Sequence, residues 1–251
     1  MRASHLAASV LMFLMFFAQC SAQQTSTSSA GRAESLIQLR STDSEVRSRA
    51  FDRLRSDPVA LRDPKVKAAL VSLLDRENKE PIHGEEEDYA EYTSWLAGTV
   101  AKIVDWDDLR QVCVLANSVD LPDELADHAK VAIPCLLGRL KNGLNRYAPG
   151  PDISRGDVIA MLVQASGKGK SEIDADTTRT VREVVLSALQ NHDADIKIPT
   201  IKALERFGGT DMIPALKVVA ETDPDPLEHY AIRRWATEAI AAIHKREQTL
   251  N

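Results

Sequence analysis

The sequence has few cysteines, no excess of basic charge and no apolar run long enough to span a bilayer, and each shortage excludes a class of protein. Three cysteines in 251 residues are too few for a small scaffold held together by disulfides. Lys and Arg number 31 against 37 Asp and Glu, a formal net charge of −6. An acidic surface argues against nucleic acid or an anionic membrane as the partner, because both reward clustered cations. The hydrophobic share of 44% is too high for a disordered chain and sufficient for a core, in one elongated domain or two small ones.

The N-terminus has the pattern of an export signal. Arg2 is followed by an apolar stretch from Leu6 to Phe17, and then by small residues up to Ala22. A transmembrane helix needs about 20 apolar residues, so this stretch is too short to remain in a bilayer. A short apolar region before small residues is typical of a secretory signal peptide. The sequence predicts a signal peptide over 1–22, cleaved after Ala22, and a periplasmic or extracellular protein with no transmembrane segment in its mature chain.

Lipid attachment is the alternative route of export. A bacterial lipoprotein would be cut just before Cys20 and lipidated on that cysteine, although Gln19 stands where a small residue is preferred. The polar segment that follows has the low hydrophobicity of a flexible linker. We therefore expect a linker over 23–32, leading to a folded domain over 33–248.

The rest of the chain has helical periodicity. Apolar residues recur at spacings of three and four, and no run shows the strict alternation of a half-buried strand. Gly and Pro, 11 of each, fall mostly between the helical segments. The pattern predicts an all-α protein with helices over 33–40, 43–56, 63–77, 85–104, 106–118, 123–141, 153–166, 174–191, 194–207, 211–221 and 227–246.

A short motif recurs in these helices. An acidic or turn residue precedes an apolar–basic pair, and small or apolar residues follow four and eight positions after the apolar one. Asp is expected to cap the helix, the apolar positions to face the core, and the basic residue to keep its charge in water at the edge of that face. The copies are DSEVRSRAFDRL with Val46-Arg47, DPKVKAALVSLL with Val66-Lys67, DADIKIPTIKAL with Ile196-Lys197, and AIRRWATEAI with Ile232-Arg233.

A second unit begins with Ile-Pro. Ile133-Pro134-Cys135-Leu136 and Ile213-Pro214-Ala215-Leu216 are separated by two periods of about 40 residues. Pro214 is expected in the first turn of its helix, where proline is tolerated, and Pro134 further inside a longer helix, which it would kink.

Together these segments resemble the HEAT-repeat family, including HEAT-like repeats related to phycobilisome-lyase proteins. The resemblance is clearest over 41–77 and 193–246. It implies a right-handed α-solenoid of about five stacked antiparallel helix pairs, a fold that usually serves as a protein-binding scaffold.

The cysteines and histidines give no metal or redox motif. Cys113 and Cys135 lie on separate predicted helices; they are either a disulfide formed in an oxidising compartment or two small buried side chains. No histidine lies four residues from another and there is no C-x-x-C, so we expect no metal site and no cofactor. The tryptophans at 95, 106 and 235 fall on predicted helices with apolar neighbours and are expected to pack in the core.

Two segments are candidates for contact with other molecules. The acidic run Glu85, Glu86, Glu87 and Asp88 begins a predicted helix, where it complements the helix dipole and could also contact a protein. The long link 144–157, LNRYAPGPDISRGD, is the stretch where a polar pocket would be sought. The sequence predicts an exported, non-catalytic scaffold that binds a protein of basic character. The alternative is a cofactor-handling enzyme or enzyme-maturation accessory with its site near 144–157.

Overall fold

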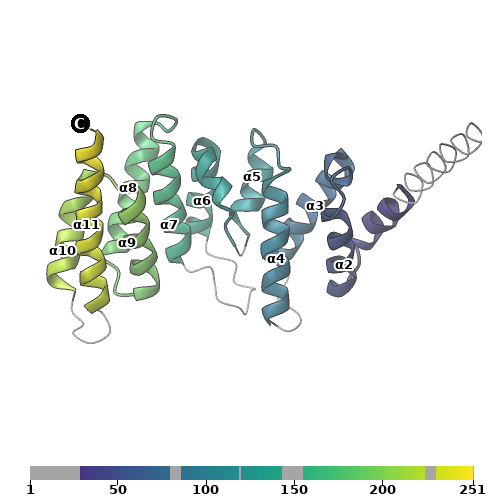
Figure 1. Ribbon diagram of the computed structural model, residues 1–251, viewed down its shortest axis with the longest axis horizontal. Coiled ribbons are helices and arrows are strands. Elements are labelled where there is room, and N and C mark those ends of the chain that lie inside the picture. Colours follow the sequence, from purple (N-terminus) through teal and green to yellow (C-terminus); the bar gives the residue numbers. More distant parts are fainter. Residues whose placement is uncertain (1–28, 80–85, 119, 143–154, 224–229, 251) are drawn as a thin grey trace, which may run out of the picture. The chain divides into compact units, whose positions relative to one another are not determined.

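The computed structural model describes residues 29–79, 86–118, 120–142, 155–223 and 230–250, and it contains helices and no strand over these ranges (Figure 1). The prediction of an all-α protein is confirmed there. A helix covers residues 29–38, and it is followed by α2 (Ser44–Arg55), α3 (Pro64–Glu77), α4 (Glu86–Ala101), α5 (Leu109–Ala116), α6 (Ala129–Asn142), α7 (Arg155–Lys168), α8 (Ala175–Leu189), α9 (Ala194–Phe207), α10 (Ile213–Thr222) and α11 (Tyr230–Leu250). Three short 3₁₀ helices join them: η1 (Ala60–Arg62), η2 (Asp123–His128) and η3 (Thr210–Met212). No helix within the described ranges is both long and apolar enough to cross a membrane.

The chain divides into two compact units, Met1–Ala69 and Leu70–Asn251. The described part of the first unit holds the helix 29–38, α2, η1 and the start of α3. Its core includes Phe51, Leu54 and Val66, which are almost completely buried. Arg32 lies in the helix 29–38 and forms an ion pair with Asp57 at 3.2 Å.

Aspartate caps begin two of the helices that carry the recurring motif. Asp43 accepts hydrogen bonds from the backbone N–H groups of Glu45 and Val46 at the start of α2, and Asp193 accepts one from Asp195 at the start of α9. A cap of this kind satisfies N–H groups that have no partner within the helix. The predicted caps are confirmed at both positions.

The basic residue of the motif is buried in two of the copies, so the expectation that its charge lies in water is wrong there. Arg47 is 3% exposed and donates to the carbonyl oxygens of Ser41 and Thr42. Lys197 is 6% exposed, and its ammonium group forms an ion pair with Asp223 at 2.7 Å. The sequence of the motif alone did not reveal these partners, because each lies in a loop that only the folded chain brings to the helix.

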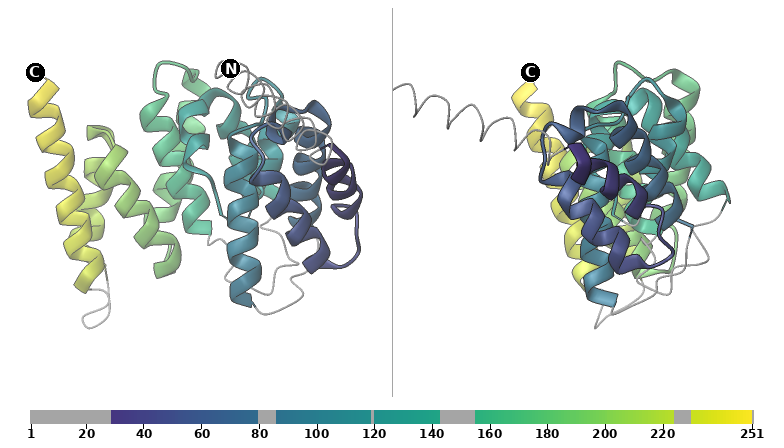
Figure 2. Two further views of the ribbon diagram at one scale, coloured as in Figure 1. Left: turned by 45° about the vertical axis from the view of Figure 1, so that its right-hand side comes forward. Right: turned by 90° about the vertical axis from the view of Figure 1, so that its right-hand side faces the viewer.

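In the second unit, alternate helices pack against one another. The helix α9 contacts both α7 and α11, while α8 contacts α7, α9 and α10 (Figures 1 and 2). Close contacts join the start of α7 to the start of α9 and the end of α7 to the end of α9, so these two helices run in the same direction. Thus α7, α9 and α11 form one layer, and α8 and α10 lie in a second.

Glycines let α7 approach α9 closely. A Cβ atom added at Gly156 would lie 2.2 Å from the carbonyl oxygen of Asp195, and one at Gly167 would lie 2.8 Å from that of Phe207. Real Cβ atoms do not approach so closely, so any side chain at either position would push the helices apart.

The region from α5 to α6 departs from the predicted pattern of antiparallel pairs. The helix expected over 123–141 is η2 followed by α6, and the helix expected from 106 begins only at Leu109, where Asp108 caps it. Contacts between Cys135 and Cys113, and then between Arg139 and Ala116, advance in the same direction along α6 and α5. These consecutive helices are therefore not an antiparallel pair.

The two Ile-Pro segments occupy different places in their helices. Pro214 lies in the first turn of α10, as predicted, whereas Pro134 is the sixth residue of α6. Pro199 is likewise the sixth residue of its helix, α9. The shared Ile-Pro start therefore does not place Pro134 and Pro214 at equivalent helix positions.

The tryptophans lie outside the core, contrary to expectation. Trp95 is 43% exposed on α4, and Trp106 lies before α5, stacked on His128 with ring centroids 3.9 Å apart. Trp235 is half-buried, with the ammonium group of Lys202 4.8 Å from its ring centroid. Apolar neighbours in sequence did not distinguish a half-buried aromatic ring from a buried one.

Candidate functional site

The second unit has an open hollow between α7 and α9, with a volume of about 360 Å³. We call it the α7–α9 groove. Its lining comes from three segments: the link before η2 (Asp120, Leu121), α7 (Asp157, Ala160, Met161, Gln164) and α9 (Pro199, Lys202, Ala203, Arg206, Phe207). The α7 residues recur at spacings of three and four, which places them on one face of the helix. The same holds for the α9 residues, so the groove follows the parallel course of the two helices.

One side of the groove is acidic. Asp157 lies in the first turn of α7, and Asp120 precedes η2; both side chains are exposed. The Asp157 carboxylate also acts on Arg139 of α6, where it favours the charged guanidinium. The two aspartates come from segments that are distant in sequence and are brought together by the packing of η2 against α7.

The other side is basic. Lys202 and Arg206 lie one helical turn apart on α9, and both are exposed. Aromatic rings lie under both cations: Lys202 sits over the ring of Trp235 of α11, and the guanidinium of Arg206 lies 5.4 Å from the centroid of the Phe207 ring. A cation over an aromatic face is attracted by the ring quadrupole, so these contacts restrain the two cationic side chains.

Apolar residues also line the groove. They include Ala160 and Met161 of α7 and Ala203 and Phe207 of α9. The residues that line the groove include no His, Cys, Ser, Thr or Tyr. Its polar side chains are two carboxylates, one amide, one ammonium and one guanidinium, a set suited to binding a ligand that carries charges of both signs.

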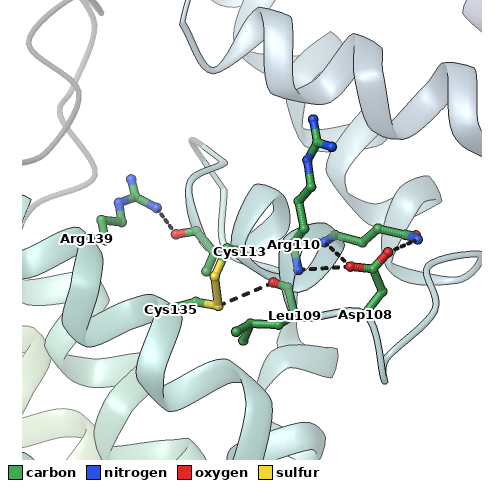
Figure 3. Close-up of a disulfide and its surroundings, with 8 residues drawn as sticks. Asp108, Leu109, Arg110, Cys113, Cys135 and Arg139 are labelled. Carbon is green, nitrogen blue, oxygen red and sulfur yellow. Dashed lines mark hydrogen bonds between the residues drawn. A yellow bond between two sulfur atoms is a disulfide. The ribbon is translucent and has the colours of Figure 1, made fainter.

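A disulfide closes the segment that contributes Asp120 and Leu121 to the groove. The sulfur atoms of Cys113 in α5 and Cys135 in α6 are joined, with their Cα atoms 4.9 Å apart (Figure 3). Sγ of Cys135 also lies 3.8 Å from the carbonyl oxygen of Leu109, a contact without a proton because both sulfurs are in the bond. The loop that the disulfide closes includes Asp120 and Leu121. The disulfide therefore restrains the link that contributes these two residues to the groove.

Arg139 holds the same segment one turn further along α6. It is 7% exposed, and its guanidinium donates to the carbonyl oxygens of Ala116 at 2.6 Å and Ser118 at 2.9 Å. Burial lowers the pKa of Arg139 to about 10, and Asp157 opposes this shift. The side chain is therefore charged at neutral pH, and it fixes the carbonyl groups at the end of α5.

A second hollow of about 280 Å³ lies at the C-terminal ends of α7, α9 and α11. Two of its cations are engaged within the fold: Arg182 pairs with Asp211 at 3.4 Å, and Arg246 donates to the carbonyl oxygens of Glu205 and Gly208. We therefore take the α7–α9 groove, whose cations lie over aromatic rings, as the candidate site for an outside ligand.

The residues singled out in the sequence are only partly placed. Cys20, Glu85 and residues 144–154 lie outside the described residues; the backbone of Glu86, Glu87 and Asp88 forms the start of α4, but their side chains are not described. Of the link 144–157, Asp157 reaches the groove. Across the described ranges no three His, Cys, Asp or Glu side chains gather in a way that could hold a metal ion.

The basic side of the groove was missed by sequence reasoning. Lys202 and Arg206 belong to KALER in a correctly predicted helix, and their i, i+4 spacing was the available signal for a basic edge. That spacing could not predict the groove, because the aspartates that also line it come from another helix and from a link. Comparisons with family models, with curated proteins and with solved structures find no match to this chain.

Proposed function

We propose that the chain is an exported, non-catalytic α-solenoid of HEAT-like helix pairs that binds another protein through the α7–α9 groove. The observation that carries the proposal is the groove itself: exposed carboxylates, exposed cations and apolar side chains line it together, and the lining side chains include no hydroxyl, thiol or imidazole group. Such a surface suits recognition by charge and shape more than acid–base or nucleophilic chemistry.

The helix packing supports a solenoid. In a solenoid each helix contacts the equivalent helix of the next repeat, so alternate helices run parallel in one layer. Here α7 and α9 run parallel, and α9 contacts α11 in turn. In the second layer, α8 likewise contacts α10, the next helix of that layer. The region from α5 to α6 would then be an altered repeat, in which η2 replaces a regular helix.

Export is supported by the leader together with the disulfide. Disulfides form and persist in oxidising compartments and are rare in the cytosol. The pairing of Cys113 with Cys135 fits a protein carried out of the cytosol by its signal peptide 1–22. Lipidation at Cys20 is the alternative mode of export.

The charge of the groove refines the expected partner. The net charge of the chain is negative and suggests a partner of basic character. The groove, however, is lined by Lys202 and Arg206 as well as by Asp120 and Asp157. A partner that binds there carries both signs of charge at the contact.

Photo-cross-linking from inside the groove tests this function. A photoreactive amino acid replaces Gln164, which lines the groove, and in a matched control it replaces Lys217, an exposed residue of α10 that lines neither hollow. After irradiation of intact cells, we expect one dominant protein adduct at 164 and none at 217. The N-terminal mass of the same sample separates cleavage after Ala22 from lipidation at Cys20.

Two results would count against the proposal. Equal adducts at both positions would mean that the groove has no special role. A small molecule retained at 164, with no protein adduct, would favour the cofactor-handling alternative, because Asp157 at the end of the 144–157 link lines the same groove.

A further inference from the structure

We infer that the second hollow, at the C-terminal ends of α7 and α9, binds the acyl chain of a fatty acid with its carboxylate beside Lys170. This site goes beyond the proposed function, because it takes a small molecule and lies apart from the α7–α9 groove. The inference follows from the apolar interior of the hollow, from the one lining cation that no described residue pairs with, and from the volume.

The second hollow lies between the two helix layers. One wall is a face of α8, whose lining residues recur at spacings of three and four, and the rest comes mainly from the ends of α7, α9 and α11. The α7 residues that line it, Val163, Ser166 and Gly167, lie on a different face of that helix from those that line the groove. Phe207 alone lines both hollows. A ligand in the second hollow would therefore not occupy the groove.

The interior of the second hollow is apolar and its opening is polar. The exposed residues that line it are polar or charged, apart from Gly167. Six lining residues are buried, and all have aliphatic or thioether side chains: Val163, Val181, Val185, Leu204, Met212 and Ile243. Apolar walls offer water few hydrogen-bond partners, so filling this interior with apolar atoms is favourable. The lining therefore favours a ligand with a hydrocarbon part.

Most of the charged side chains that line the second hollow are engaged within the fold. Arg182 pairs with Asp211, and Arg246 donates to carbonyl oxygens at the end of α9. Glu247 also interacts within the fold. Lys170, in the link between α7 and α8, is exposed, and the described part of the chain supplies no ion pair or hydrogen bond to its ammonium group. The charge that remains available at the opening is positive, and it favours a carboxylate as the polar end of the ligand.

The volume of the second hollow limits the size of the ligand. A water molecule occupies about 30 Å³ in the liquid, so a hollow of about 280 Å³ has room for roughly nine groups of that size. This room suits one acyl chain of medium length and is too small for the paired chains of a phospholipid. We therefore expect a free fatty acid rather than a membrane lipid.

Two methionines report the two hollows separately. Met212 lines the second hollow, and Met161 lines the α7–α9 groove. When the methionine methyl groups are isotope-labelled, each gives an NMR signal that the Met212→Leu and Met161→Leu variants assign. A ligand in the second hollow shifts the Met212 signal and leaves the Met161 signal unchanged.

A titration that varies the chain length and the head group tests the ligand class. The full chain is titrated with octanoate, hexanoate and octylammonium, each below the concentration at which it forms micelles. We expect octanoate to shift the Met212 signal and to bind roughly fifteenfold more tightly than hexanoate, which has two fewer methylene groups to bury. Octylammonium should bind about fivefold more weakly than octanoate, because its charge is repelled by Lys170. No binding of octanoate, a shift of Met161 in place of Met212, or equal affinity for the three probes would overturn the inference.

Removing the charge of Lys170 gives the complementary test. Lys170→Gln should weaken octanoate binding by about fivefold and abolish the preference over octylammonium. The matched control is Lys217→Gln, which removes the same charge from an exposed residue of α10 that lines neither hollow. Both side chains are exposed, so both variants should fold. Equal weakening by the two substitutions would show a nonspecific charge effect and overturn the inference.

The titration and the cross-linking experiment fail in different ways. If octanoate does not bind while the photoreactive residue at 164 still captures one protein, the fatty-acid site is wrong and the scaffold function stands. If octanoate shifts Met212 with the expected preferences but no protein is captured at 164, the fatty-acid site stands and the proposed scaffold function fails.

Discussion

At the scale of single residues, buried cations connect helices to the loops around them. Arg47, Lys197 and Arg139 are all buried, and each donates to backbone carbonyl groups or to a buried carboxylate. A buried charge is tolerated only when it is paired and hydrogen-bonded, so these contacts are specific to the fold. An apolar side chain of the same size at any of these three positions would leave the acceptor groups that the cation contacts without this donor.

Replacing Arg139 by Met tests this role. The carbonyl groups of Ala116 and Ser118 would each lose the donor that Arg139 supplies, and an unsatisfied buried polar group costs about 1–3 kcal/mol. We expect the free energy of unfolding in urea to fall by at least that amount. Arg139→Lys, which keeps a donor, should lose less; a Met variant as stable as the parent would contradict the assignment.

The caps make acid stability depend on aspartate ionisation. Asp174 caps α8, and hydrogen bonds from the backbone N–H and the hydroxyl of Thr177 hold the pKa of its carboxyl below the usual 3.8. The unfolded chain then binds the proton more readily, so the stabilisation is present above pH 3.8 and is lost as the pH falls through the lower pKa of the folded state.

Thermal unfolding measured from mildly to strongly acidic pH checks this dependence. We expect Asp174→Asn, which keeps a capping oxygen and cannot ionise, to reduce the loss of Tm over this range. A matched change at an exposed aspartate outside a cap, Asp176→Asn, serves as the control. Identical acid profiles for the parent and the Asp174 variant would show that the cap contributes nothing to acid sensitivity.

At the scale of elements, the approach of α7 to α9 depends on two glycines. Because Gly156 and Gly167 lie near opposite ends of α7, the helices are in close contact at both ends of the groove. The charged residues that line the groove are carried on these same helices and on the link before η2. A change in helix spacing would therefore move the acidic and basic sides relative to each other.

Gly156→Ala should destabilise the protein. The new methyl group would meet the carbonyl oxygen of Asp195, and relief of such a clash in a packed interface costs about 1–3 kcal/mol. Gly98→Ala in α4 is the control, because nothing lies within 4 Å of the added atom and alanine is the better helix former. Urea unfolding should show opposite changes for the two variants; a stabilised Gly156→Ala would mean that the helices are not in close contact.

At the scale of the second unit, the disulfide joins two helices whose connection is irregular. The segment between α5 and α6 contains η2 in place of a full helix, so it buries less regular structure than its neighbours. Cys113 and Cys135 close this segment, and the residues between them include the link that contributes Asp120 to the groove.

Removing the disulfide should destabilise the chain and increase the local opening of the segment between α5 and α6. The double variant Cys113→Ser and Cys135→Ser loses a constraint that contributes about 3 kcal/mol in the chain-entropy model for a loop of this length. We expect a lower Tm and faster hydrogen exchange over 117–128, with little change in α11. Unchanged exchange in that segment would show that Arg139 and the surrounding packing restrain it without the disulfide.

Local sequence patterns were sufficient for most of the helices. The α9 helix begins and ends as predicted, since Asp193 caps its start and Gly208 follows its end. Prediction was wrong where short-range signals were ambiguous. Residues 123–128 have a helical pattern that continues into α6, yet they form a 3₁₀ helix. The groove was not predictable, because its two charged sides come from segments that are far apart in the sequence.

The sequence by itself determined the all-α class and the capping aspartates over the described residues, because helical periodicity and capping act within a few neighbouring residues. Only the tertiary structure decided that Arg47 and Lys197 are buried, that the tryptophans lie outside the core and that Asp157 lines the same groove as Lys202. These features depend on contacts between residues far apart in the chain. Periodicity indicates which face of a helix is buried, but not which other segment covers it.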